Sequence, residues 1–247
     1  MSNHNEFIQN GYVVFEKYFS NEDITQINNA IEEVKSLPDI DVYKDRSGNL
    51  RRIEHFTYRH DVLKRVDEKL KALLLDVTST EQALFKDKIN FKPPGGEGFY
   101  AHYDGIFQFQ KKDGVTRNGW YEYASDFNNA LIVLDSFTDV NGALEISRIR
   151  RGDFETLLAD TKCNGTPDIK DDLTVDLEFR PLYCPRGSVV LFKHNCPHRS
   201  GPNYSASDRR SLYLTYNNLS DGAFYDAYFL DKTGSTNQNK ALTGDLA

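Results

Sequence analysis

The sequence has few cysteines, no long apolar run and no excess of basic residues. Its three cysteines, Cys163, Cys184 and Cys196, are an odd number without CxxC spacing. This argues against a disulfide framework and suits reduced thiols in the cytoplasm. No apolar stretch approaches the roughly 20 residues of a membrane-spanning helix, and a net charge of −7 argues against a general nucleic-acid surface. We therefore expect a soluble, cytoplasmic protein without nucleic-acid or membrane partners.

Internal repeats, low-complexity blocks and a long Pro/Gly/Ser linker are also missing. The first residues do not combine a basic segment with an apolar stretch, so no secretory signal is visible. Of the 247 residues, 39% are apolar and 13% aromatic, which is enough to fill a sizeable core. We expect one domain over residues 1–247, in which the polar segment 232–247 is loosely held. The sequence does not predict an oligomeric state.

Two segments in the first third of the chain have the period of amphipathic helices. Ser20 is suited to an N-cap position, with Asp23 three residues later, and apolar residues follow at helical spacing as far as Leu37. Over about 61–76, apolar residues again recur on one helical face and charged residues occupy the rest. Both segments are predicted to be helices that pack on a core.

After Phe85 the pattern changes to short β-branched or aromatic runs bounded by turn residues. These runs cover residues 88–92, 129–135, 187–192 and 211–216. Helices followed by strands predict an α+β fold, in which N-terminal helices brace a double-sheet sandwich of the jelly-roll or cupin-like type, the double-stranded β-helix.

Three residues have the pattern of metal ligands: His102, Asp104 and, 96 positions after His102, His198. On a strand or its extended exit, residues two apart point to the same face, so His102 and Asp104 converge. Two imidazoles and one carboxylate form the ligand set that holds Fe(II) on one side and leaves positions open for a cosubstrate and O₂. The pattern predicts an oxygenase site with these three residues at its centre.

Motifs along most of the chain support this prediction. They are the opening run 7–15, the helix after Ser20, the Lys-Pro-Pro-Gly-Gly lead into His102, Asn141-Gly-Ala-Leu-Glu, Arg186-Gly-Ser-Val-Val-Leu-Phe and the stretch 198–209. Together they resemble the phytanoyl-CoA dioxygenase-like branch of the Fe(II)/2-oxoglutarate-dependent oxygenases, in which the opening run looks like the first strand. The resemblance implies Fe(II), O₂ and 2-oxoglutarate as cosubstrate, and decarboxylation to succinate coupled to oxidation of a substrate C–H bond. The chain departs from the family pattern at Ile149-Arg-Arg-Gly-Asp, where Pro-Gly-Ser-His is frequent.

The same resemblance assigns roles to further residues. An arginine eleven positions after the distal histidine binds the remote carboxylate of 2-oxoglutarate in such enzymes, and Arg209 occupies that position, with Arg210 as the alternative. A guanidinium suits this task because it grips a carboxylate with two donors and stays charged. Ser211 and Asn90 are candidates for a further hydrogen bond to the cosubstrate. An aspartate at position 104 favours hydroxylation or desaturation over halogenation.

The substrate is predicted to be a small, polar molecule. Aromatic residues near the His-x-Asp motif are candidates for the pocket wall: Tyr100, Tyr103, Phe107, Trp120 and Tyr121. Four basic residues could receive an anionic group of the substrate: Arg51, Arg52, Lys92 and Arg117.

Other interpretations of the same residues remain open. His194 is four positions before His198, but the strand and turn around it argue against a helical ligand pair. His55 and His60 are expected at the edge of the core or in solvent, and His4 in a tail. The chain could also be a metal-dependent isomerase or hydrolase on a cupin-like barrel, because fold alone does not fix function. A non-catalytic relative is the third alternative.

Overall fold

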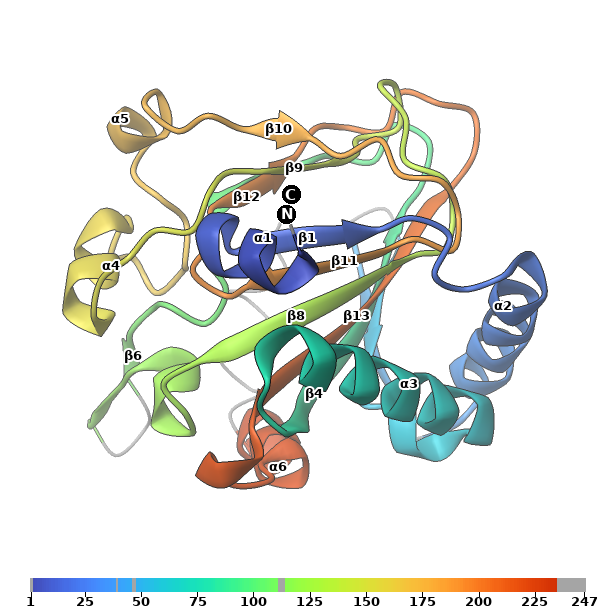
Figure 1. Ribbon diagram of the computed structural model, residues 1–247, viewed down its shortest axis with the longest axis horizontal. Helices are drawn as coiled ribbons and strands as arrows, with labels where there is room; N and C mark the ends of the chain where they lie inside the picture. Colours follow the sequence, from blue (N-terminus) through green and yellow to red (C-terminus); the bar gives the residue numbers. More distant parts are fainter. Residues whose placement is uncertain (1, 39, 46–47, 111–113, 235–247) are drawn as a thin grey trace.

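The computed structural model describes residues 2–38, 40–45, 48–110 and 114–234 (Figure 1). Its α-helices are α1 (Asn3–Asn10), α2 (Asn21–Lys35), α3 (Asp61–Thr78), α4 (Phe154–Asp160), α5 (Asp171–Thr174) and α6 (Tyr225–Gly234). Three short 3₁₀ turns cover Thr57–Arg59, Gly119–Glu122 and Leu219–Asp221. In this part of the chain, no helix is long and apolar enough to cross a lipid bilayer.

The strands form two antiparallel sheets and a small hairpin. The large sheet has the order β1 (Tyr12–Phe15), β11 (Val189–Lys193), β8 (Phe127–Val133), β13 (Arg209–Asn218), β4 (Gln82–Lys92), β3 (Leu50–Glu54) and β2 (Asp41–Lys44). The small sheet has the order β10 (Arg180–Pro181), β9 (Leu144–Ile146), β12 (His198–Ser200) and β5 (Phe99–His102). The hairpin pairs β6 (Phe109–Gln110) with β7 (Thr116–Arg117). The predicted α+β fold with two sheets and bracing helices is confirmed.

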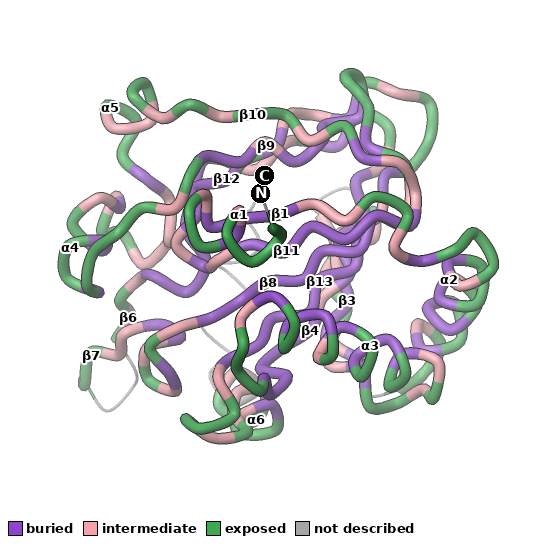
Figure 2. Tube along the Cα trace, viewed as in Figure 1, coloured by how far each residue is buried: buried purple, intermediate pink, exposed green. Residues whose placement is uncertain are grey.

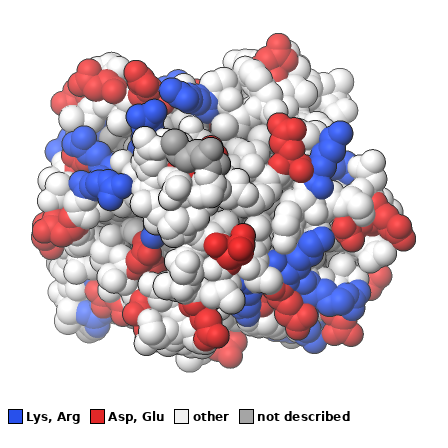
Figure 3. Space-filling view, in the orientation of Figure 1, with Lys and Arg blue, Asp and Glu red and all other residues white. Residues whose placement is uncertain are grey.

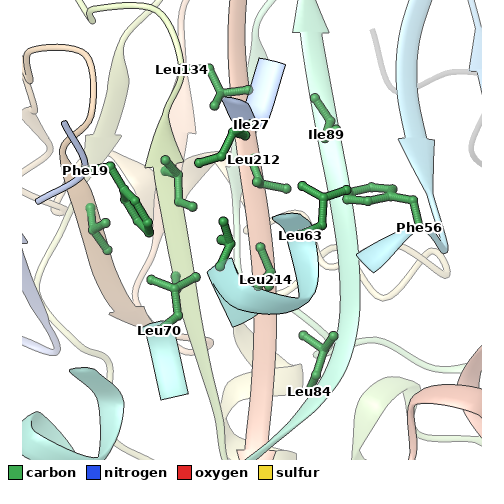
Figure 4. Packing of buried hydrophobic residues seen from close by; sticks show 14 of the residues in the cluster. Phe19, Ile27, Phe56, Leu63, Leu70, Leu84, Ile89, Leu134, Leu212 and Leu214 are labelled. Carbon is green, nitrogen blue, oxygen red and sulfur yellow. The ribbon is translucent and has the colours of Figure 1, made fainter. Parts of the chain in front are cut away.

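The large sheet has an outer face, covered by α2 and α3, and an inner face, which looks toward the small sheet. On the outer face, Leu212 and Leu214 of β13 pack with apolar side chains of both helices (Figure 4). On the inner face, Leu131 and Val133 of β8 pack with residues of β9 in a second core. Figure 2 shows the central strands buried along most of their length. Because successive side chains of a strand alternate between faces, each central strand serves both layers.

The start of α2 follows the prediction made for Ser20. The Ser20 hydroxyl accepts a hydrogen bond from the backbone N–H of Asp23 at 3.0 Å, and the Asp23 carboxylate accepts one from the backbone N–H of Ser20 at 2.9 Å. This capping box satisfies two N–H groups that a helix start leaves unpaired. The second predicted helix is also present, as α3.

The predicted order of helices followed by strands is interrupted by β2 and β3, which lie between α2 and α3 and were not predicted. β2 and β3 are short and rich in charged residues, so they lack the apolar pattern of a buried strand. The predicted opening strand is shorter than 7–15: Phe7 lies in α1, and the chain turns at Gly11, whose φ is 80°, before β1 begins. A positive φ of this kind suits glycine.

The two ends of the described chain are more ordered than expected. His4 lies in α1, and its Nδ1 is 2.7 Å from the carbonyl oxygen of Val77 in α3. Lys232 lies in α6 and pairs with the buried carboxylate of Glu54. Residues 232–234 of the segment predicted to be loosely held belong to α6, and its remaining part, 235–247, lies outside the described residues.

Candidate metal and cosubstrate site

The small sheet brings the two predicted histidine ligands together. His102 ends β5 and His198 begins β12, and the antiparallel register of these strands places the two residues opposite each other. Their ring centroids lie 4.1 Å apart. Residues separated by 96 positions thus become neighbours through strand pairing.

Asp104 completes the cluster from the segment after β5. Its backbone N–H donates to the carbonyl oxygen of His194 at 2.8 Å, and its Oδ2 lies 3.6 Å from Nε2 of His198. One ligand atom from each of His102, Asp104 and His198 lies within 4.8 Å of the other two, in the only such group found among the described residues. That spacing allows one ion to contact all three atoms.

Both imidazoles have the orientation of metal ligands. Nδ1 of His102 lies 2.7 Å from the carbonyl oxygen of Tyr100, and Nδ1 of His198 lies 3.0 Å from that of Cys196. A carbonyl can only accept, so each Nδ1 carries the proton and each Nε2 keeps a free lone pair. Burial and the neighbouring His102 lower the pKa of His198 to about 3, against the opposing charge of Asp104. His198 is therefore neutral at physiological pH, as metal binding requires.

The carboxylate of Asp104 is ionised and held in place. Burial alone raises the pKa of Asp104, but electrostatic interactions with the neighbouring imidazole and lysine groups, His198 and Lys88 first among them, outweigh that effect and lower the pKa to about 2. Nδ2 of Asn129 donates to Oδ2 of Asp104 at 2.9 Å, and the hydroxyl of Thr215 donates to Oδ1 of Asn129 at 2.7 Å. The prediction from sequence missed this chain of two buried groups. Its only signal was the pair of asparagines, Asn128 and Asn129, at the start of an otherwise apolar strand.

Arg209 lies on the inner face at the start of β13. Its guanidinium donates to the Ser211 hydroxyl at 3.0 Å and to the carbonyl oxygen of Gly142 at 2.7 Å, and it lies 5.0 Å from the ring centroid of Phe137. Burial lowers its pKa from the usual value, but an arginine stays charged. Its Nε is buried, and no partner for it exists among the described residues. The guanidinium therefore has a donor left for a ligand.

Arg210, the alternative, points to the other side of the sheet. Its Nε and one terminal nitrogen each donate to the carboxylate of Asp135 at 2.8 Å. This paired guanidinium is not available for a cosubstrate on the inner face. Asn90, the other candidate, pairs in register with Ser211 and accepts from Nε of Arg52 at 3.2 Å. Asn90 and Ser211 thus lie beside each other on the inner face, near Arg209.

The five candidate pocket aromatics do not form one wall. Tyr100 is 69% exposed. Tyr103 lies in a core with Phe154 and donates to Asp160 at 3.0 Å, whereas Trp120 lies in a different core. The hydroxyl of Tyr121 contacts Nε2 of His194 at 3.0 Å. Phe107 is half-buried and packs 5.9 Å from the ring of Phe109, measured between centroids.

The remaining histidines have structural partners. His194 is buried between Tyr121 and the backbone of Phe127 and lies outside the ligand group. His60 caps α3 by accepting from the backbone N–H of Val62 at 3.1 Å. The ring of His55 stacks on Phe229 at 4.3 Å.

Of the four basic residues expected to receive a substrate anion, Arg52 and Lys92 lie on the inner face. Lys92 donates to the Ser200 hydroxyl and the Gly201 carbonyl at 2.8 and 2.6 Å. Arg51 donates to the carbonyl oxygen of Glu97 at 3.4 Å and lies 3.9 Å from Asp45, and Arg117 lies 3.8 Å from Glu122. Lys86 and Lys88, which the sequence prediction did not single out, also lie on the inner face of β4. Lys86 and Lys88 are two positions apart, with Asp87 between them, and this spacing could have predicted that both lie on one face of the strand.

Known proteins agree with this geometry. A 2-aminoethylphosphonate dioxygenase from Uncultured bacterium HF130_AEPn_1 is 32% identical over 187 residues, which are 74% of this chain and 64%, just under two thirds, of that protein. A methylphosphonate hydroxylase from Gimesia maris is 27% identical over 248 residues, covering 96% of this chain and 88% of that protein. The crystal structure of EctD from S. alaskensis without ligands has the same fold, with a TM-score of 0.69, 20% identity, and coverage of 90% of this chain and 78% of that chain.

A family model also matches residues 7–211, and its description is phytanoyl-CoA dioxygenase. With these relatives, it confirms the enzyme class predicted from the sequence, a dioxygenase that depends on Fe(II) and 2-oxoglutarate and acts on a small molecule. The chain belongs to the phytanoyl-CoA dioxygenase family.

Proposed function

We propose that this protein binds Fe(II) through His102, Asp104 and His198 and hydroxylates a C–H bond of a small phosphonate. The convergence of the three ligand atoms within 4.8 Å of one another carries the proposal. Two neutral imidazoles and an ionised carboxylate are the donor set of non-haem Fe(II) oxygenases. Bound Fe(II) supplies the activation of O₂ that accompanies decarboxylation of 2-oxoglutarate.

Asp104 favours hydroxylation because it occupies a coordination position that a halide would otherwise need. The hydrogen bond from Asn129 fixes Oδ2 of Asp104, which also lies 3.6 Å from Nε2 of His198, so it limits rotation of the carboxylate. Outer groups of this kind typically change metal affinity or activity about 10- to 100-fold. We infer that Asn129 and Thr215 hold Asp104 in its ligating position.

Arg209 is the proposed anchor for the remote carboxylate of 2-oxoglutarate, with Ser211 and Asn90 beside it. A buried donor without a partner costs about 1–3 kcal/mol, and Nε of Arg209 is such a donor within the described chain. A carboxylate bound at the guanidinium relieves this cost with charge-assisted hydrogen bonds. The residues present therefore fit the cosubstrate.

Two observations support a phosphonate as the substrate. The two most similar relatives described above are named for 2-aminoethylphosphonate and methylphosphonate. The inner face of β3, β4 and β13 also carries more cations than carboxylates, which suits a small molecule with a doubly charged head group. Neither observation favours a nucleic acid or a membrane as partner.

The proposed catalytic unit is one domain, because both sheets contribute to the site: β5 and β12 carry the histidines, and β13 carries Arg209. We place the enzyme in the cytoplasm. The cysteines Cys163, Cys184 and Cys196 are free thiols, and a reducing compartment keeps both thiols and ferrous iron in the required state.

Succinate release tests the proposal. The protein is supplied with Fe(II), 2-oxoglutarate and O₂, and succinate is measured with 2-aminoethylphosphonate, with methylphosphonate and with ethylamine, which lacks the phosphonate. We expect both phosphonates, but not ethylamine, to stimulate succinate formation and to gain a hydroxyl group. Uncoupled succinate formation that no phosphonate increases would contradict the substrate class while leaving the enzyme class intact.

A further inference from the structure

Side chains on the inner face of β4 form cross-strand rows with those of β13. Lys86 pairs with Thr215, Lys88 with Tyr213, Asn90 with Ser211 and Lys92 with Arg209. Directly paired residues project to the same face of a sheet. Thr215, the partner of Lys86, donates to Asn129, which in turn donates to the metal ligand Asp104. Arg209, the proposed cosubstrate anchor, is the partner of Lys92. Lys88 therefore lies between the metal end and the cosubstrate end of this face.

Lys88 is the one residue of β4 that is not buried; the other ten are. β4 is an inner strand of the sheet, and α2 and α3 cover its outer face. Exposure at the middle of such a strand has to come from the inner face. The exposed part of Lys88 therefore lies on the face that also carries Arg209 and Thr215.

The neighbouring basic residues Lys86 and Lys92 have hydrogen-bond partners, but none is found for Lys88 among the described residues. Lys92 donates to Ser200 and Gly201, and Lys86 lies 3.3 Å from the hydroxyl of Tyr228. Nζ of Lys88 lies 4.7 Å from the ring centroid of Tyr213. No hydrogen-bond acceptor or ion-pair partner of Lys88 exists in the described part of the chain. Its three N–H donors are available for a ligand.

Carboxylates do not balance the charge of this face. The inner faces of β3, β4 and β13 carry one carboxylate, Glu54, which pairs with Lys232 and lies 3.4 Å from Arg52. They carry five basic side chains: Arg52, Lys86, Lys88, Lys92 and Arg209. Burial and the charge of Arg209 lower the pKa of Lys92 to about 6, so Lys92 contributes less positive charge than the others. On the outside of the molecule, by contrast, Lys and Arg are interspersed with Asp and Glu, as Figure 3 shows for one face. Asp104 adds a negative charge, but as a proposed metal ligand it balances the charge of the ion and not that of the lysines.

The surroundings of Lys88 also act on its own charge. Desolvation by the surrounding protein lowers the pKa of Lys88 to about 7, against the charges of Asp104 and Glu54 and with help from those of Arg52 and Lys86. An anion bound at the amine favours its protonated form. Binding of an anion at Lys88 and protonation of its amine therefore favour each other.

We propose that Lys88 binds the phosphonate oxygens of the substrate and determines the preference for anionic substrates, with Arg52 in the adjacent row adding to the positive field. This inference rests on the proposed function. Arg209 anchors the cosubstrate at one end of the face, and Lys88 holds the substrate nearer the metal. The carboxylate of 2-oxoglutarate and the phosphonate of the substrate are thus kept apart, and each is bound by a different basic residue.

Binding measurements on the Mn(II)-loaded protein test this role without turnover. Methylphosphonate and 2-oxoglutarate are titrated separately by calorimetry into the wild type, Lys88→Met, Lys88→Arg and a control, Lys64→Met, whose lysine is exposed on α3. Loss of one charged hydrogen-bond donor corresponds to roughly 10- to 100-fold weaker binding. We expect that loss for methylphosphonate in Lys88→Met, partial recovery in Lys88→Arg, and 2-oxoglutarate affinity within about 3-fold of the wild type in all variants.

Each other result contradicts the inference in a different way. If Lys88→Met weakens 2-oxoglutarate binding instead, Lys88 serves the cosubstrate. If the wild type binds methylphosphonate and Lys88→Met binds it equally well, the role of Lys88 is wrong while the substrate class stands. If the wild type does not bind methylphosphonate, the substrate class itself fails. Thermal unfolding of Lys88→Met, expected at or above the wild-type midpoint because a poorly solvated amine is removed, shows that the variant is folded.

Discussion

The two faces of β4 and β13 differ in polarity, although they belong to the same two strands. On the outer face, Ile89, Leu212 and Leu214 join the apolar core under α2 and α3. On the inner face of the same strands, Lys88 and Arg209 alternate with these residues. One face provides folding free energy through apolar burial, and the other carries groups whose burial costs energy. The comparison indicates that stability and chemistry can be changed separately along one strand.

We expect the largest effect on activity, without an effect on folding, from removal of a metal ligand. His198→Ala removes one of three ligands, so we expect a loss of activity on the order of 10³-fold or more, with the domain still folded. The activity assay is succinate release, and circular dichroism checks the fold. Arg199→Ala is the matched control, because Arg199 is the next residue on β12 and pairs with Glu145 at the surface. Unfolding of His198→Ala, or near-normal turnover, would show that His198 is not a ligand.

An outer-face change is expected to have the opposite profile. Leu214 is 1% exposed, and Leu214→Ala leaves a cavity that costs about 2–5 kcal/mol of unfolding free energy. Denaturant unfolding measures this loss, and Mn(II) affinity of the folded fraction should stay close to that of the wild type. Leu75→Ala, at a 46% exposed position of α3, is the control and should change stability little. A Leu214→Ala protein with normal stability but impaired metal binding would remove the distinction between the faces.

We expect a smaller effect on metal binding from changes to Asn129 and Thr215, which hold the ligand Asp104 in place. Asn129→Ala removes the donor to Asp104, and we expect about 10- to 100-fold weaker metal binding. Thr215→Val, one group further away, should weaken it less. Co(II) titration followed by its visible absorption measures both. Equal affinity in wild type and Asn129→Ala would mean that the backbone contact of Asp104 with His194 is enough to orient the carboxylate.

Local patterns in the sequence were sufficient to predict several parts of the molecule. The Ser20 capping box depends on residues three apart, and the two amphipathic helices depend on their own periods. The convergence of His102 and Asp104 follows from a spacing of two. These features need no knowledge of what packs against them.

Features that depend on pairing between distant segments could not be predicted in the same way. The choice between Arg209 and Arg210 depends on which side of β13 faces the small sheet, because adjacent residues point in opposite directions. The link from Asn129 to Asp104 joins β8 to the segment after β5. Aromatic residues such as Tyr103 and Trp120 suit an apolar core as well as a pocket, so their composition alone did not distinguish the two.

We infer that the space between the two sheets holds Fe(II) and 2-oxoglutarate together. The most direct test is an anaerobic titration of the Fe(II)-loaded protein with 2-oxoglutarate, followed through the weak visible charge-transfer band of a chelated 2-oxo acid. We predict that the band appears in the wild type and in Arg210→Ala, is absent in Asp104→Ala, and needs a higher 2-oxoglutarate concentration in Arg209→Ala. Absence of the band from wild-type protein that has bound iron would contradict the claim.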